Sequence, residues 1–174
     1  MHHILAGKNL ALISARSNKS PDPDHFFCSR FTVEAKCGES TTQSCTFPLY
    51  IYPFDDDEKS GQPGLKIDTS VWPAAKGGRK PNLEPDFVAG LEKRLDLLFL
   101  SDGNGDLKKT FGPEDIFNYI YAVFHSPAYR TRYAEFLKLD FPRVPLTSDV
   151  KLFRSLCGLG AELVALHLLE SPKL

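Results

Sequence analysis

The sequence predicts an α+β fold, in which an antiparallel β-region comes first and a helical bundle of about four helices follows. Short β-branched and aromatic runs, separated by polar turns, occupy residues 9–54, and apolar residues recur at helical spacing from Pro81 onward. The 174 residues, of which 42% are hydrophobic, suffice to bury the core of one domain. We therefore expect a single domain over residues 1–174, made of a β-rich subregion (1–55), a linker or loop (56–80) and a helical scaffold (81–174).

Three runs in the first third of the chain predict strands, at residues 9–15, 25–34 and 46–52. In the second run, Phe27, Phe31 and Val33 fall near period two, which is typical of a half-buried strand. We expect these three side chains to share the buried face of that strand. The segment between Pro53 and Pro81 is rich in residues that break regular structure, so it predicts a long crossing loop or a flexible linker.

Start and stop signals predict the helices. Pro85 fits the first turn of one helix, and the turn at residues 101–106 follows that helix. Acidic residues after Thr110 begin a second helix. Ser126 begins a third helix, which runs to about Leu139. The last helix is predicted over residues 149–170. The apolar residues expected on the buried faces are Phe87, Val88, Leu91, Leu95 and Leu98, then Ile116, Phe117, Ile120, Tyr121 and Phe124, then Tyr129, Tyr133, Phe136 and Leu137, and finally Leu152, Phe153, Leu156, Leu159, Leu163, Leu166 and Leu169.

The composition limits which partners and which cellular compartments we expect for this protein. Lys and Arg number 21 and Asp and Glu 22, so the net charge of -1 gives no whole-chain argument for nucleic acid, and a DNA surface would need local clustering. The four cysteines form no CxxC pair, and we expect reduced thiols in the cytoplasm. No apolar run approaches the roughly 20 residues that span a bilayer, so we expect no membrane segment.

Two catalytic or metal-binding patterns are present in part. Asp22 or Asp24 with Glu34 and Lys36 matches the spacing of a PD-ExK nuclease, which needs its acids at adjacent strand ends, whereas here the aspartates fall in a predicted turn. Residues 102–106 copy the first half of an EF-hand loop, but the second half fails, which favours a tight turn whose aspartates bond local amides.

Other reactive residue types favour structural roles. His125 lies among aromatic residues at a predicted helix end, and Cys157 lies on an apolar helix face, so both are expected to pack or cap. Phosphate-binding glycine loops, GxSxG, HExxH and the Asn/Asp-Pro-Pro-Tyr/Phe motif of amino-methyltransferases are missing from the sequence. We therefore expect no catalytic residue and no metal or cofactor site in this chain.

Longer strings resemble a known family. These strings are Thr110-Phe-Gly-Pro-Glu-Asp115 with the residues after it to Pro127, residues 79–83, 102–107, 129–138, 140–146 and 159–167, and Phe47-Pro-Leu-Tyr-Ile-Tyr-Pro53. They resemble the C-terminal specificity region of type ISP restriction-modification enzymes. Related adenine methyltransferases look similar here. The resemblance is strongest from Phe47 onward and weakest over residues 16–46, where a specificity domain would diverge with its DNA target.

The resemblance implies a target-recognition domain that acts on double-stranded DNA in a prokaryotic cytoplasm. In that family a nuclease, an ATP-driven translocase and an N6-adenine methyltransferase precede it, so S-adenosylmethionine, ATP and Mg²⁺ are implied for the parent polypeptide and none for this chain. Residues 3–10 resemble the junction with the methyltransferase, so we expect Met1 to begin a fragment whose catalytic residues lie upstream.

Side-chain chemistry then suggests which residues contact DNA. Major-groove reading needs paired donors or acceptors, and phosphates need cations. The strand residues Arg30, Glu34 and Lys36 are expected to project from the polar face of the second strand, and residues 37–46 form a polar reading loop. The candidate base contacts are Arg16, Asn18, Lys19, Arg30, Glu34, Lys36, Glu39, Thr41 and Gln43, and the candidate phosphate contacts are Lys76, Arg79 and Lys80.

Two alternatives remain open at this point. The first is a small Mg²⁺-dependent nuclease built on the PD-ExK pattern. The second is a helical protein-interaction module, because the helical half holds many aromatic residues, some of which could face a partner.

Overall fold

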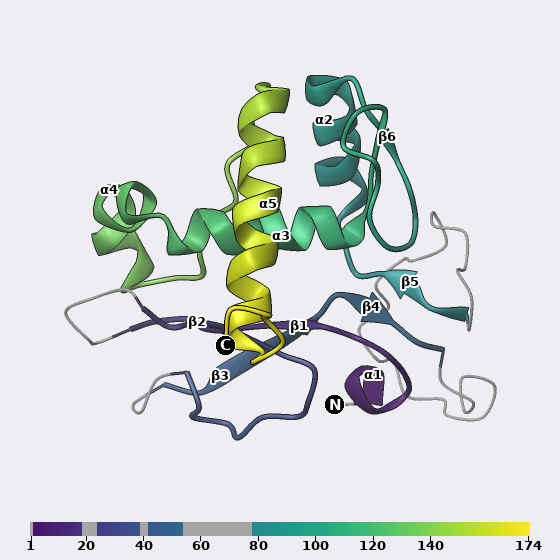
Figure 1. The fold of residues 1–174 in the computed structure, drawn as a ribbon. Coiled ribbons are helices and arrows are strands. Elements are labelled where there is room, and N and C mark those ends of the chain that lie inside the picture. The colour runs from purple at the N-terminus through teal and green to yellow at the C-terminus, as the bar shows by residue number, and fades with distance from the viewer. Residues whose placement is uncertain (1, 19–23, 39–41, 54–77) are drawn as a thin grey trace.

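The computed structural model describes residues 2–18, 24–38, 42–53 and 78–174, and confirms an α+β fold in which the main antiparallel sheet precedes the long helices (Figure 1). A short helix α1 (His2–Leu5) precedes the strands β1 (Ala11–Ala15), β2 (Phe26–Ser29), β3 (Ser44–Pro48), β4 (Tyr50–Ile51) and β5 (Lys80–Pro81). After them come α2 (Pro85–Leu95), β6 (Leu98–Phe99), β7 (Thr110–Phe111), α3 (Pro113–His125), α4 (Pro127–Leu137) and α5 (Val150–His167). Within the described ranges, no helix is long and apolar enough to cross a membrane.

The main sheet has three strands in the order β2-β1-β3, with both neighbours antiparallel to β1. Strands β2 and β3 are therefore parallel to each other, and the chain between them, residues 30–43, must return along the whole length of the sheet. Ile13 pairs with Phe27 on one side and Thr46 on the other, so these three side chains share a face. Ser14, Phe26 and Cys45 share the opposite face, which packs on the helices.

The described residues of this connection, 30–38 and 42–43, lie over the face that points away from the helices, which we call the outer face (Figure 1). The Ser44 amide donates to the Ala35 carbonyl over 2.6 Å, and a Cβ on Gly38 would touch the Phe27 ring. Ile13 points to this outer face and is nevertheless only 2% exposed, as expected beneath such a cover. The sheet is thus sandwiched between the helices and its own connecting segment.

The prediction for the second strand was wrong in length and in face. Strand β2 ends at Ser29, where Ser29 Oγ accepts from the Phe31 amide and donates to its carbonyl, which bends the chain. Phe26 is the buried residue, while Phe27 and Phe31 are 41% and 77% exposed. Period-two counting chose the wrong set because Phe27 itself lies on the outer face of the strand, and because the counting continued past the bend at Ser29.

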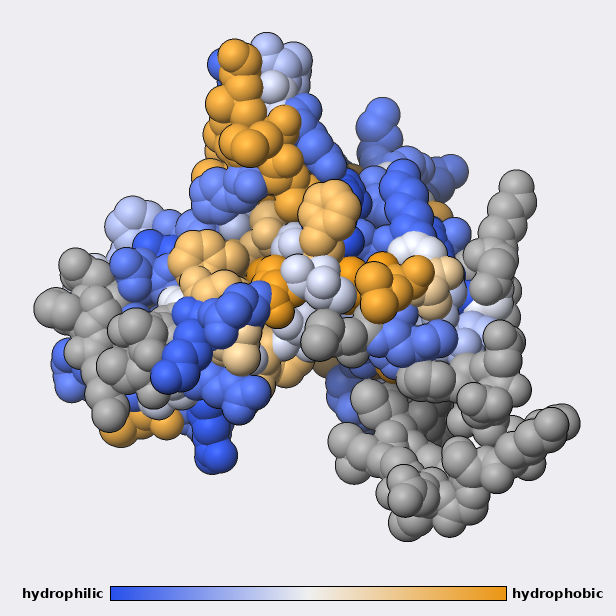
Figure 2. Space-filling model, turned by 90° about the horizontal axis from the view of Figure 1, so that it is seen from below, coloured by the Kyte–Doolittle hydropathy of each residue, from blue (hydrophilic) through white to orange (hydrophobic). Residues whose placement is uncertain are grey.

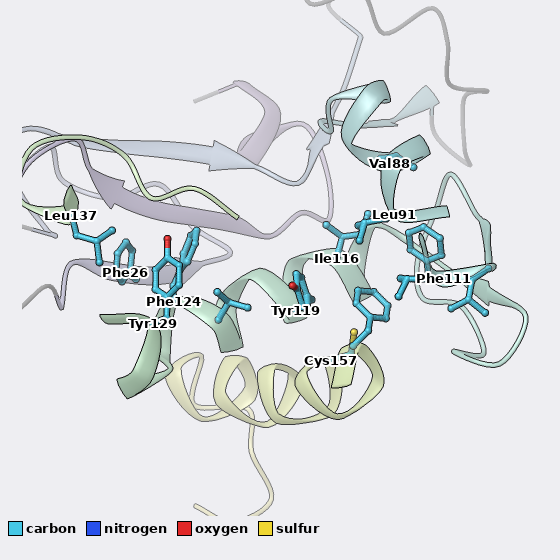
Figure 3. Packing of buried hydrophobic residues seen from close by; sticks show 14 residues of the cluster. Phe26, Val88, Leu91, Phe111, Ile116, Tyr119, Phe124, Tyr129, Leu137 and Cys157 are labelled. Atoms are coloured by element: carbon cyan, nitrogen blue, oxygen red, sulfur yellow. The ribbon is translucent and has the colours of Figure 1, made fainter. Parts of the chain in front are cut away.

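The core surrounds α3, which lies across the sheet and is crossed by α5 (Figure 1). At one end of the cluster Phe26 packs against Phe124, with ring centroids 4.9 Å apart, and at the other end Ile116 lies near Leu91 (Figure 3). At the crossing, a Cβ on Gly160 would overlap the backbone carbonyl of Asn118. The two helices therefore approach closely enough that only glycine fits.

This close crossing corrects the predicted buried face of the last helix. Its buried residues are Phe153, Cys157, Gly160 and Val164, whereas Leu152, Leu159 and Leu169 are 48%, 57% and 80% exposed. The helix meets α3 through this set, with Gly160 at the closest approach and Phe153 against Tyr119, and Leu152 and Leu159 are left facing solvent. Leu98 also departs from prediction, because α2 ends at the left-handed Asp96 and leaves Leu98 in β6 with 70% exposure.

Candidate nucleic-acid interface

The exposed side chains of residues 31–38 and 42–46, which we call the outer surface, form the main polar surface over the sheet. Glu34, Lys36 and Gln43 are exposed here together with Thr32 and Thr46. A cavity of about 400 Å³ lies between this surface and α1, and its lining includes Ile4, Thr32, Gln43, Ser44 and Thr46. Seen from below in Figure 2, the molecule shows hydrophilic and hydrophobic groups interspersed rather than one continuous apolar patch.

A turn positions the predicted contacts Glu34 and Lys36. The Glu34 carbonyl accepts from the Cys37 amide over 3.2 Å, and its carboxylate accepts from the Lys36 amide over 2.7 Å. The prediction that Arg30, Glu34 and Lys36 lie on the second strand is therefore wrong, because all three follow its end at Ser29. The turn fixes the backbone and leaves the Lys36 ammonium exposed.

The same turn argues against the nuclease alternative. A PD-ExK site needs Glu34 at a strand end beside a second acid, but Glu34 lies in a turn. Asp22 lies outside the described residues. Within the ranges that the structure describes, no group of three or more His, Cys, Asp and Glu side chains could hold a metal ion.

At one end of the sheet, the residues after β1 meet the residues before β3. Ser17 Oγ and Thr42 Oγ1 are 3.3 Å apart, which joins the two segments. Arg16 is exposed and donates from Nε to Asp140 over 3.2 Å. Asn18 is only 1% exposed and bonds His25 Nδ1 over 2.9 Å, so its side chain belongs to the interior and not to a surface. The predicted contacts Lys19, Glu39, Thr41 and Lys76 lie outside the described residues.

Arg79, predicted to contact phosphate, makes internal contacts at the opposite end of the sheet. Its Nε donates to Asp102 over 2.9 Å, its Nη1 donates to the Lys8 carbonyl over 3.0 Å, and its guanidinium lies 3.9 Å above the Tyr50 ring. Burial alone would lower its pKa, but hydrogen bonds to Asp102 and Tyr52 outweigh burial and raise it. Arg79 therefore joins three segments of the fold, while Lys80 follows it in β5.

Arg30 lies at this same end, directly after β2. Its Nε and Nη2 donate to the two carboxylate oxygens of Glu170 over 2.7 and 3.1 Å. The hydrogen bond to Glu170 raises the pKa of Arg30, and the same bond lowers the pKa of Glu170. The predicted contacts are thus divided: Arg16 and Gln43 lie at one end, Arg30 and Arg79 at the other, and Glu34 and Lys36 on the connecting segment.

The remaining motifs have structural roles. Asp106 accepts from the amides of Lys108, Lys109 and Thr110, which lower its pKa, and Gly103 has a φ of 67°, so the predicted tight turn is confirmed. Cys157 donates to the Asp115 carbonyl over 3.3 Å, and burial raises its pKa to about 12, as expected for a core thiol. His125 bonds the Tyr121 carbonyl over 2.9 Å at the end of α3, and burial lowers its pKa.

The fold and this surface define an α+β domain that displays polar connecting-segment side chains over a small antiparallel sheet. The chain belongs to the family of Type ISP C-terminal specificity domains, whose sequence profile matches residues 1–174. No curated protein matches the sequence.

Two solved structures are similar over 93% of the chain. One is the DrdV–DNA complex solved by cryo-electron microscopy, with 26% sequence identity and a TM-score of 0.58. The other is LlaBIII, described as an ATP-dependent Type ISP restriction-modification enzyme bound to DNA, with 20% identity and a TM-score of 0.53, which shows the fold. The chain spans 12% and 8% of the length of those two proteins.

Proposed function

We propose that this domain reads DNA sequence for a type ISP restriction-modification polypeptide, positioning double-stranded DNA for N6-adenine methylation and ATP-dependent restriction. Membership of the specificity-domain family supports the proposal, and both similar structures are DNA complexes. The observation that carries it is the outer surface. The described part of the connecting segment, residues 30–38 and 42–43, lies outside the strands and presents side chains of several chemistries above the sheet.

The outer surface holds the side-chain types that distinguish base pairs in the major groove. Lys36 offers donors to guanine, Gln43 offers a paired donor and acceptor to adenine, and the Glu34 carboxylate accepts from cytosine. Phe31, which counting by periodicity assigned to the core, is 77% exposed and adds an apolar contact suited to a thymine methyl group. Periodicity assigned Phe31 to the core because it follows Phe27 at period two, whereas Phe27 itself lies on the outer face.

The rest of the enzyme would be supplied by domains of the parent polypeptide. The chain spans 12% of the DrdV chain, so we assign S-adenosylmethionine, ATP and Mg²⁺ to upstream methyltransferase, motor and nuclease domains. The exposed leucines of α5, such as Leu152 and Leu159, provide an apolar surface that suits docking against those domains. A restriction-modification role also places the parent protein in a prokaryotic cytoplasm.

A domain graft tests the proposal. Residues 9–80 replace the corresponding residues of a full-length type ISP enzyme, and sequencing maps the methylated adenine. We expect the methylated sequence to change, because the graft carries the outer surface. A matched graft of residues 81–174 alone is expected to keep the host's methylation sequence. An unchanged sequence with an active 9–80 graft would refute the assignment.

A further inference from the structure

A second cavity lies on the helix side of the sheet, at the Arg30 end. Its volume is about 190 Å³, and segments far apart in the sequence form its wall. Lys8 precedes β1, Arg30 follows β2, Asn118 lies on α3 and Glu170 follows α5, with Leu10 and Val164 supplying apolar wall. Arg30 links this cavity along the chain to residues 31–38 of the outer surface.

The Arg30 guanidinium holds a carboxylate in this cavity through paired parallel bonds. Two nitrogens donate to the two oxygens of Glu170, and the side chains are 34% and 46% exposed. A phosphodiester presents two oxygens with a matching separation and the same single charge. The Glu170 side chain is exposed enough to move into solvent, so an incoming phosphate could replace it without opening the core.

Two further hydrogen-bond donors line the same cavity, and neither donates to another group of the described chain. Within the described part of the chain, neither the Lys8 ammonium nor the Asn118 side-chain amide takes part in a hydrogen bond or ion pair. The remaining charged lining groups are engaged elsewhere, since Arg79 bonds Asp102 and Glu114 accepts from Asn104 over 3.0 Å. Once Glu170 has left, the cavity lining offers the donors of Lys8, Arg30 and Asn118, and Glu114 is the one carboxylate that remains in it.

We propose that this cavity binds one backbone phosphate of DNA through Lys8, Arg30 and Asn118, and that Glu170 occupies the Arg30 guanidinium until DNA displaces it. The inference rests on the proposed function and adds to it a positioning contact, which carries no sequence information itself. It also assigns Arg30, placed among the base contacts by sequence, to the DNA backbone.

The test uses the complete 174-residue chain labelled with ¹⁵N and titrated with a short DNA duplex of arbitrary sequence. Binding at the cavity is followed at the Arg30 Nε–H and Asn118 side-chain amide signals, and binding at the outer surface at the amides of Lys36 and Gln43. Two charge-matched pairs of variants are compared. Glu170→Gln is paired with Glu162→Gln, which breaks the exposed ion pair to Lys173, and Lys8→Gln is paired with Lys173→Gln.

We expect Glu170→Gln to bind the duplex about three- to fivefold more tightly than Glu162→Gln, because only the former frees a phosphate-binding guanidinium, at the cost of one exposed ion pair. Lys8→Gln should weaken DNA binding more than Lys173→Gln does. It should also reduce the slope of log affinity against log salt concentration by about the amount that one phosphate contact contributes. The Lys8 side chain makes no internal bond in the described structure, so this variant should fold normally.

Each outcome has a distinct meaning. Equal affinities of Glu170→Gln and Glu162→Gln, or duplex-induced shifts at Lys36 and Gln43 without shifts at Arg30 and Asn118, would overturn the phosphate site and leave the proposed function standing. Shifts at neither place would count against the proposed function itself. Equal shifts with inorganic phosphate alone would show a general anion site and overturn its assignment to DNA.

Discussion

The crossing of α3 and α5 at Gly160 offers a sharp test of the packing, because a second glycine of the same helix provides a control. Gly160 is buried against the Asn118 carbonyl, whereas nothing lies within 4 Å of a Cβ built on Gly158, which is exposed. Replacing either glycine by alanine gains about 1 kcal/mol of helix propensity. Gly158→Ala should therefore raise the free energy of unfolding by up to that amount.

Gly160→Ala should lower the free energy of unfolding instead. Overpacking costs about 1–3 kcal/mol, and we expect the upper end because the obstacle is backbone that no rotamer change can move. After the propensity gain, a loss of about 2 kcal/mol remains, so the two variants should differ by about 3 kcal/mol. For a domain of this size that corresponds to a difference in Tm of about 6–12 °C.

Urea denaturation followed by circular dichroism measures both variants under identical conditions, with m values checked for two-state behaviour. If Gly160→Ala proves as stable as Gly158→Ala, then α5 does not cross α3 in the way described, and the assignment of its buried face fails with it.

Three further predictions follow from the structure. Phe26→Ala should destabilise the domain by about 3–5 kcal/mol and Phe27→Ala by under about 1 kcal/mol, and the reverse order in chemical denaturation would restore the face predicted by period-two counting. Hydrogen bonds from backbone amides lower the pKa of Asp106 in the folded state, so its stabilising contribution is present above its ordinary pKa of about 3.9 and is lost as the pH falls through the folded value. Asp106→Ala should therefore lose less stability than the parent chain on acidification below about pH 4. Identical profiles of stability against pH for the two chains would contradict this. Exposed Cys37 should react rapidly with a thiol reagent while buried Cys157, with its pKa raised to about 12, reacts only on unfolding, and rapid labelling of Cys157 in the folded chain, located by peptide mass, would refute its burial.

Local signals in the sequence sufficed for much of the helical half. Pro85 lies in the first turn of α2, the acidic residues Glu114 and Asp115 lie in the first turn of α3, and Ser126 caps α4. Asp149 caps α5 through the amides of Lys151 and Leu152. These features depend on neighbours within one helical turn, so a single sequence displays them.

The buried faces of the strands and helices were harder to predict from the sequence, because they depend on contacts between distant segments. Counting apolar residues placed Leu152 and Leu159 inside, but the close crossing at Gly160 selects a face of small residues, and nothing local announces a helix crossing. In the candidate site, too, local sequence predicted exposure better than it predicted contacts between distant segments. The exposure of Gln43 followed from its polar neighbours, whereas the internal partners of Arg79 and Asn18 come from elsewhere in the chain.

The connection between β2 and β3, whose described residues 30–38 and 42–43 lie on the outer face, has a consequence for how new DNA specificities arise under the proposed function. This segment closes the path between two strands that each pair with β1 alone, so its length and composition can vary while the β1 ladders stay intact. Loop-closure entropy rises only slowly with added residues, which makes insertions there thermodynamically cheap. Under the proposed function, a library confined to this one connection is expected to yield altered DNA target sites on an unchanged scaffold.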